Sequence, residues 1–192
     1  ARPDWGVLYL HGGGFVSCSD QSHNKLAAWV GHAAKATVWL PNYSLAPEYA
    51  YPKGLSDALT VYTNLLAAGQ DPEKLIIAGD SAGGGLALAT ALRIKNLGLP
   101  RPAGLVLYSP WVDLSQSGRS IVTHAHRDAM LKPDWIRWCA DQYRGELPAD
   151  HPGCSPLFDD LSDLPPTLVH VGSEEILLSD SERLVAKLKS SG

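Results

Sequence analysis

The chain has 192 residues, of which 45% are hydrophobic and 19% are charged, and its formal net charge is -4. This is the size and composition of one globular domain with a sizeable core. No cluster of lysines and arginines indicates a phosphate-binding surface, which argues against nucleic acid as a partner. The three cysteines, Cys18, Cys139 and Cys154, are an odd number without close spacing. They argue against a disulfide framework or a zinc site and favour a reducing, cytoplasmic compartment.

The hydropathy of the chain bears on membrane association, and its two ends bear on whether the domain is truncated. No segment approaches the roughly 20 apolar residues of a transmembrane helix, so no membrane association is expected. Residues 1–6 include no methionine and no signal-like apolar stretch, and they run almost directly into a strand pattern. The chain stops just after a helical pattern. With no repeat or linker, we expect a single domain over residues 1–192 that is truncated at both ends.

Short apolar runs alternate with longer amphipathic stretches, a pattern typical of parallel strands joined by helices. The predicted strands span residues 6–10, 36–40, 75–78, 104–108 and 167–171. The predicted helices span residues 24–35, 55–67, 82–97 and 180–190. Residues 38–40, 75–78 and 105–107 are apolar at consecutive positions, which predicts strands covered on both faces.

Residues 115–156 interrupt the alternation. No strand pattern occurs there, but Trp135, Trp138 and Tyr143 predict a helix that follows Pro133. Long segments of this kind inside a compact domain usually carry function, often as lids. We therefore expect a lid-like insertion that partly covers a site.

The first motif follows the first strand and reads His11-Gly12-Gly13-Gly14-Phe15. Three glycines allow backbone N–H groups to approach a ligand without interference from side chains. Alone, a triple glycine is most often a flexible turn. After an early strand of a hydrolase, such a segment supplies donors to the oxyanion hole of lipases and esterases.

The second motif is Gly79-Asp80-Ser81-Ala82-Gly83, and it fits the G-x-S-x-G nucleophile elbow. It stands between a predicted buried strand and a predicted helix, where a tight turn exposes the serine hydroxyl at a helix N-terminus. The alternatives are a glycine-rich turn or a phosphate loop. No lysine follows the glycines, which weakens the phosphate-loop alternative.

Together these motifs resemble the bacterial hormone-sensitive-lipase-like carboxylesterases, a branch of the α/β-hydrolase superfamily. The matching stretches, in the order of the family, are residues 11–15, 43–48, 79–84, 109–114 and 172–177. The resemblance implies an α/β-hydrolase fold with a mostly parallel sheet and helices on both faces, here reduced to the central strands and part of the cap.

The resemblance also assigns roles to residues. It implies that the backbone amides of Gly13, Gly14 and Ala82 form the oxyanion hole. His11 and the segment 43–48 would support this loop structurally.

The acid of the triad is expected after the strand 167–171, since the order in this fold is serine, acid, histidine. The family usually has an aspartate two residues before a leucine, and Glu175 stands at that position. Either carboxylate can orient and stabilise an imidazolium. Glu174 is the nearest alternative, and Asp113 is a weaker one.

The catalytic base is missing from this order. The chain has seven histidines, and none follows Glu175. A rearranged triad that uses one of the seven is disfavoured, so we expect the base beyond Gly192. The resemblance places the five strands side by side with two unnatural edges, so we expect the chain alone to be poorly behaved and catalytically very weak.

These inferences predict a serine carboxylesterase that hydrolyses small-molecule esters of short to medium acyl length through an acyl-enzyme on Ser81, without a metal or organic cofactor. Amide or formamide hydrolysis on the same machinery stays open. So does a ligand-binding protein of the same fold that has lost its catalytic histidine. Since relatives often dimerise, a homodimer is one expectation for the intact protein.

Overall fold

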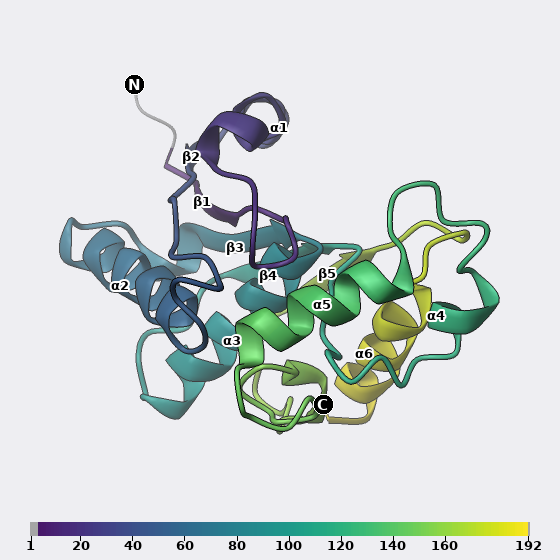
Figure 1. Ribbon diagram of the computed structural model, residues 1–192. Helices are drawn as coiled ribbons and strands as arrows, with labels where there is room; N and C mark the ends of the chain where they lie inside the picture. The colour runs from purple at the N-terminus through teal and green to yellow at the C-terminus, as the bar shows by residue number, and fades with distance from the viewer. Residues whose placement is uncertain (1–3, 192) are drawn as a thin grey trace.

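A computed structural model describes residues 4–191 and shows a single parallel sheet flanked by helices (Figure 1). The strands are β1 (Gly6–Leu10), β2 (Thr37–Trp39), β3 (Leu75–Asp80), β4 (Gly104–Tyr108) and β5 (Thr167–His170). Their order in the sheet is β2-β1-β3-β4-β5, and every pair is parallel. The five strands are therefore adjacent, as the resemblance implied. Residues 1–3 and Gly192, at the ends of the expected domain, lie outside the described residues.

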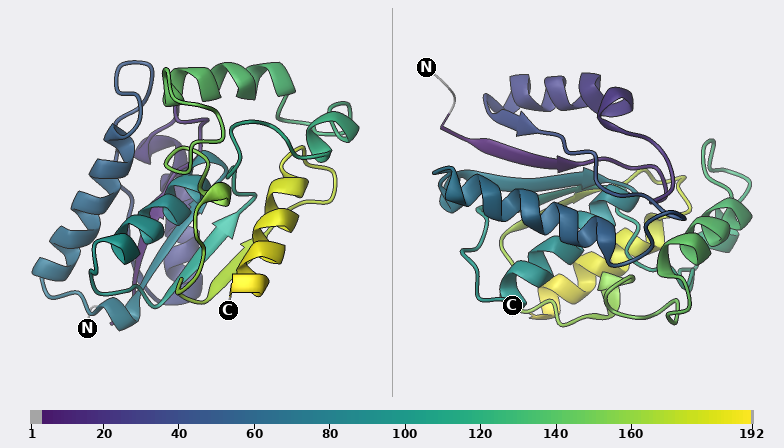
Figure 2. Two further views of the ribbon diagram at one scale, coloured as in Figure 1. Left: turned by 90° about the horizontal axis from the view of Figure 1, so that it is seen from below. Right: turned by 60° about the vertical axis from the view of Figure 1, so that its left-hand side comes forward.

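Helices cover both faces of the sheet, as predicted. They are α1 (Asp20–Ala34), α2 (Lys53–Ala67), α3 (Ala82–Asn96), α4 (Ser120–Thr123), α5 (Pro133–Arg144) and α6 (Leu178–Ser191), with short 3-10 turns η1 (Pro72–Lys74) and η2 (Pro156–Phe158). Helix α1 lies on one face, whereas α2, α3 and α6 lie on the other (Figure 2). Helix α1 begins four residues earlier than predicted, where the N–H of Ser19 donates to Ser22 Oγ at 2.9 Å. The single turn α4 was not predicted.

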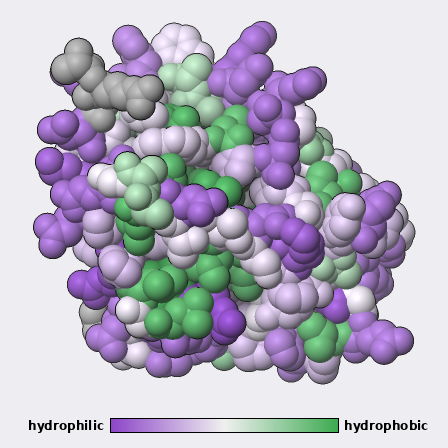
Figure 3. Space-filling model, turned by 90° about the vertical axis from the view of Figure 1, so that its left-hand side faces the viewer, coloured by the Kyte–Doolittle hydropathy of each residue, from purple (hydrophilic) through white to green (hydrophobic). Residues whose placement is uncertain are grey.

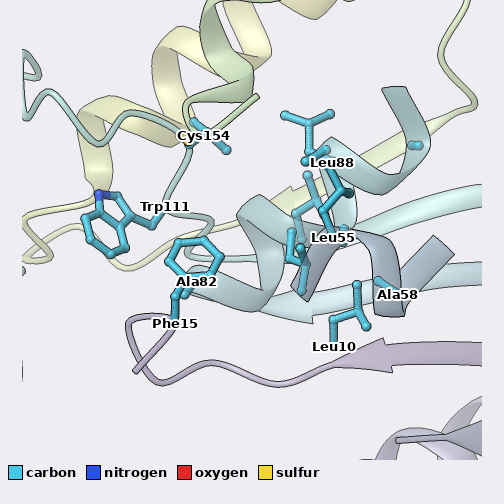
Figure 4. Packing of buried hydrophobic residues seen from close by; sticks show 14 of the residues in the cluster. Leu10, Phe15, Leu55, Ala58, Ala82, Leu88, Trp111 and Cys154 are labelled. Atoms are coloured by element: carbon cyan, nitrogen blue, oxygen red, sulfur yellow. The ribbon is translucent and has the colours of Figure 1, made fainter. Parts of the chain in front are cut away.

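The core is built on the central strands. All five residues of β1 are buried, and Leu8 and Leu10 belong to the large cluster shared with α2, α3 and α6. Val7 and Tyr9 alternate with them and join a smaller cluster on the side of α1. Figure 4 shows the large cluster around the start of α3, where side chains from β1, α2 and the loop after β4 converge.

The burial of the edge strand β2 differs from the prediction. Residues 38–40 were expected to be covered on both faces, but every residue of β2 is only half-buried. The prediction fails there because β2 is an edge strand and α1 covers its face incompletely. Between α1 and the sheet lies an apolar depression of about 380 Å³, whose lining includes Val7, Trp29 and Val106. Strand β5, the other edge, alternates between half-buried and exposed residues.

The two ends of the sheet have different surfaces. At the amino ends of the strands, hydrophobic side chains form small patches among hydrophilic ones (Figure 3). At the carboxyl ends, the long loops gather together with α4 and α5 (Figure 2), and both sequence motifs lie there. In residues 4–191, no helix combines the length and apolar character needed to cross a bilayer.

Candidate active site

Ser81 occupies the turn between β3 and α3 in a backbone conformation that residues with a side chain rarely adopt. Its backbone has φ 54° and ψ -121°. Such a positive φ costs on the order of 1–3 kcal/mol at a residue other than glycine and persists only where the surroundings impose it. Here the N–H of Ser81 donates to the carbonyl oxygen of Tyr108 at 2.8 Å, and Trp111 N donates to the Ser81 carbonyl at 2.9 Å. Strand β4 and the loop that follows it thus fix the turn.

The glycines on either side of Ser81 are required by close backbone contacts. A Cβ atom on Gly79 would lie 2.3 Å from the carbonyl oxygen of Gly83. A Cβ on Gly83 would lie 2.1 Å from the carbonyl oxygen of Leu10. Both distances are far below van der Waals contact, so β1, β3 and α3 approach this closely only without side chains. The geometry is that of a nucleophile elbow.

The glycine-rich segment after β1 lies next to this turn. Gly13 and Gly14 have φ values of 124° and 64°, and Phe15 also has a positive φ. A Cβ on Gly14 would lie 2.9 Å from Cys139 Sγ and 3.0 Å from the ring of Trp135, so α5 lies against this segment. Within residues 4–191, the N–H groups of Gly13 and Gly14 have no hydrogen-bond acceptor. They are therefore available as donors.

Asp80, the first of the two variable residues in the G-x-S-x-G motif, connects this motif with the glycine-rich segment. Its Oδ1 accepts hydrogen bonds from Gly12 N and from the Tyr9 hydroxyl, each at 3.0 Å. His23 Nε2 lies 3.4 Å from Asp80 Oδ2. Sequence reasoning did not single out Asp80, because the variable position of the motif carries no signal of its own.

His11 and the segment 43–48 contact the other side of the glycine-rich segment. The ring of His11 stacks on Tyr43 with centroids 4.4 Å apart, and the Tyr43 hydroxyl donates to the His11 carbonyl at 2.6 Å. Ala46 N donates to the Phe15 carbonyl at 2.9 Å. Burial lowers the pKa of His11, which keeps the ring neutral inside the fold. These contacts fit the structural role that the resemblance implied.

Ser81 and Glu175 line the same pocket, which has a volume of about 440 Å³. The pocket is lined by residues at the carboxyl ends of β3 and β4, by part of the insertion (residues 115–156) and by the loop after β5. The lining residues are Asp80, Ser81, Tyr108, Ser109, Arg127, Asp128, Ala129, Met130, Leu131, Glu174, Glu175 and Leu177. The polar wall thus contains a serine and a glutamate, and the insertion contributes most of the apolar wall.

The two neighbouring glutamates of this loop have different surroundings. Glu175 is half-buried, and its Oε1 accepts the N–H of Gly172 at 2.7 Å. Glu174 is exposed and forms a 3.7 Å ion pair with Arg127, which is exposed as well. The geometry therefore favours Glu175 over Glu174 as the carboxylate held within the pocket.

Asp113, the weaker alternative, is fully buried outside the pocket. Its carboxylate accepts from Ser115 and Ser117 and forms a 2.7 Å ion pair with Arg183. Burial alone would raise the pKa of Asp113, but these hydrogen bonds and the guanidinium lower it below its ordinary value. The residue is engaged in linking the loop after β4 to α6.

None of the histidines in residues 4–191 lines the pocket that Ser81 and Glu175 share. His170 ends β5 and is exposed, with its ring 5.9 Å from that of Tyr108. His23 is outside the pocket lining, and its Nε2 lies 3.4 Å from Asp80 Oδ2. Over the same described range, no group of three or more His, Cys, Asp or Glu side chains could hold a metal ion.

Comparisons with known proteins agree with this geometry. A model of the family described as the alpha/beta hydrolase fold matches residues 7–192. The acetyl-hydrolase of Streptomyces hygroscopicus is 41% identical over 178 residues, which cover 93% of this chain and 60% of that protein. The esterase of Acinetobacter venetianus is 40% identical over 182 residues, covering 94% of this chain and 60% of that protein.

Solved structures point to the same group. The crystal structure of an esterase from the bacterial hormone-sensitive lipase family matches with a TM-score of 0.98 and 40% identity, covering 100% of this chain and 65% of that one. The crystal structure of EstE5 matches with a TM-score of 0.97 and 42% identity, covering 98% of this chain and 64% of that one. The chain belongs to the α/β-hydrolase fold family, as the resemblance predicted for the superfamily. Within that fold it is similar to an acetyl-hydrolase and to an esterase of the hormone-sensitive lipase family. It spans 60% of the length of the two curated relatives from Streptomyces hygroscopicus and Acinetobacter venetianus.

Proposed function

We propose that the whole protein is a serine carboxylesterase that hydrolyses small-molecule esters of short to medium acyl length through an acyl-enzyme on Ser81. One observation carries this proposal. A strained turn at φ 54° presents Ser81 to a pocket that Glu175 also lines, beside backbone N–H groups that have no acceptor within the described residues. A serine, a carboxylate and free backbone donors are three of the four parts that ester hydrolysis by this chemistry requires.

The fourth part is a general base. We place it on a histidine in the part of the protein outside this chain, since the relatives are longer and the order of the fold puts the histidine after the acid. Its imidazole would enter the pocket between Ser81 and Glu175. Glu175 would hold the ring in the correct orientation and stabilise the imidazolium that forms.

The reaction then follows the geometry of the two motifs. The base takes the proton of Ser81 Oγ as the oxygen attacks the ester carbonyl. The N–H groups of Gly13, Gly14 and Ala82 stabilise the tetrahedral oxyanion, and one such donor is worth about 2.7–4 kcal/mol. The imidazolium protonates the leaving alcohol, and a water molecule, deprotonated by the same base, releases the acid and restores Ser81.

The expected substrates follow from the pocket wall and from the relatives. Residues 127–131 of the insertion bring Ala129, Met130 and Leu131 to the pocket, which suits an apolar acyl or alcohol group. A relative at 41% identity is named an acetyl-hydrolase, which supports the short end of the acyl range.

The test uses the full-length protein, meaning the gene product that contains this chain, and p-nitrophenyl esters from acetate to decanoate. We expect turnover that falls at least 10⁴-fold in Ser81→Ala and about 10²- to 10⁴-fold in Glu175→Gln. Glu174→Gln is the matched control, with an expected change below about twofold because its ion pair is exposed. A folded protein without turnover on any of these esters would contradict the proposal and favour the ligand-binding alternative.

A further inference from the structure

Two side chains of the insertion hold the backbone of Ile176, the residue that follows Glu175. The N–H of Ile176 donates to Asp128 Oδ2 at 2.9 Å. The carbonyl oxygen of Ile176 accepts the hydroxyl of Ser120 at 2.5 Å. Ile176 itself is fully buried. Both backbone groups beside the proposed acid are thus bound by residues 48 and 56 positions away in the sequence.

Asp128 uses both of its oxygens as acceptors. While Oδ2 binds Ile176, Oδ1 accepts the N–H groups of Met130 and Leu131, each at 2.8 Å. The side chain is almost fully buried. Burial alone would raise its pKa, but hydrogen bonds from Leu131, Ile176 and Met130 lower it, so the group is a carboxylate at neutral pH. A carboxylate with three N–H donors is a strong and specific anchor.

Ser120 extends the anchor to the start of α6. Its N–H donates to Ser179 Oγ, and its Oγ accepts the N–H of Ser179, both at 2.9 Å. Asp128 and Ser120, at the two ends of the segment 120–128, therefore hold residues 176–179 through Ile176 and Ser179. The exposed ion pair between Arg127 and Glu174 lies beside these contacts and contributes little to them.

We propose that Asp128, with Ser120, is a positioning residue that holds the loop of Glu175 so that its carboxylate faces the pocket shared with Ser81. The inference rests on the proposed function of Glu175. Asp128 also lines that pocket, but its two oxygens are engaged by three backbone donors, so it acts through Glu175 and does not itself orient the base. The insertion is then part of the triad's support as well as a wall of the pocket.

Asp128→Asn in the full-length protein tests this proposal. The asparagine NH2 group would replace one of the two carboxylate oxygens, so it would face backbone N–H groups from which it cannot accept hydrogen bonds. We expect kcat to fall about 10- to 100-fold with KM within about threefold, as for a misplaced catalytic group. Asp134→Asn, an exposed position on α5 in the same insertion, is the matched control and should leave kcat unchanged within about twofold.

A second readout separates positioning from loss of folded enzyme. Rates are normalised by active-site titration, and kcat/KM is measured against pH. A carboxylate that faces the imidazole raises the pKa of the base, so displacement of Glu175 should move the acid limb to lower pH. The other titratable groups that line the pocket, Asp80, Tyr108, Arg127 and Glu174, are unchanged in the variant. A loss of rate with an unmoved acid limb would overturn the proposal.

Two further variants, Ser120→Ala and Glu175→Gln, distinguish a failure of the positioning role from a failure of the acid assignment. If Asp128→Asn does not fold, Ser120→Ala replaces it, with an expected 5- to 10-fold fall in kcat and the same direction of the pH shift; unchanged kinetics would overturn the proposal. If Glu175→Gln retains full activity, the acid assignment itself fails. If Glu175→Gln is inactive but Asp128→Asn and Ser120→Ala behave as wild type, only the positioning role fails. Hydrogen exchange of the Ile176 amide, measured on the same variants, should accelerate in Asp128→Asn.

Discussion

The turn that carries Ser81 and the loop that carries Glu175 lie at the same end of the sheet, but different kinds of contact hold them. Around Ser81, backbone packs on backbone, and Cβ atoms on Gly79 or Gly83 would lie within 2.3 Å of carbonyl oxygens. Around Glu175, side chains from distant segments bind the backbone, above all Asp128 and Ser120 on Ile176. The first region depends on the absence of side chains, and the second depends on the presence of particular ones.

Side chains that bind backbone in this way should respond to charge, and Asp180, near the start of α6, is the strongest case. Its Oδ2 accepts the N–H groups of Val112 and Asp113, each at 3.0 Å. Burial and, next, the charge of Asp113 raise the pKa of Asp180 to about 7. Between about pH 4 and pH 7, the folded protein thus keeps a proton that the unfolded chain has lost. The stability that the protonated Asp180 contributes to the folded state is fully present below about pH 4 and is lost as the pH rises through about 7.

Asp180→Asn removes that titration. We expect the difference in unfolding free energy, variant minus wild type, to increase from pH 4 to pH 8 by on the order of 4 kcal/mol. Urea denaturation at several pH values measures it. A difference that stays flat over this range would show that Asp180 does not titrate as the buried geometry requires.

The first region should respond to volume. Gly83→Ala places a Cβ 2.1 Å from the carbonyl oxygen of Leu10, which cannot move without shifting β1. We expect a loss of about 3 kcal/mol in unfolding free energy. Gly98→Ala is the control: its φ is +64° but its surroundings are open, so it should cost only about 1 kcal/mol. Equal costs for the two substitutions would contradict the close-packed turn.

Tyr9→Phe asks how far the first region also depends on side chains. The hydroxyl of Tyr9 is one of two donors on Asp80 Oδ1, and Gly12 N remains in its absence. We expect a loss of about 1 kcal/mol in stability and a fall in kcat of only a few fold. Tyr49→Phe, at an exposed position, is the comparison. A fall in kcat as large as that of Asp128→Asn would remove the distinction between the two regions.

Arg127→Ala should have the smallest effect. Arg127 and Glu174 are both more than half exposed and lie 3.7 Å apart, so their ion pair should contribute less than about 0.5 kcal/mol. We expect kcat within twofold of wild type in an esterase assay. A larger fall would mean that this surface pair, and not the buried Asp128, holds the loop of Glu175.

The same contrast explains what the sequence could and could not predict. The elbow at Ser81 is readable because glycines at fixed spacing report a local steric requirement, and consecutive apolar residues correctly indicated the strands β3 and β4. The sequence did not predict the capping contact at Ser19, the turn α4 or the hydrogen bond between Asp128 and Ile176. Asp128 binds Ile176 from 48 residues away, and no local pattern marks such a contact. The incomplete cover of β2 was misjudged, because an apolar run says nothing of which partner packs on it.

The central claim is that Ser81 is the nucleophile, and covalent trapping tests it most directly. The full-length protein is treated with a fluorophosphonate, digested and mapped by mass spectrometry, alongside Ser81→Ala. We predict one phosphonyl adduct, on the peptide that contains Ser81, together with complete loss of esterase activity. An adduct on another residue, or full inhibition with Ser81 unmodified, would contradict the assignment.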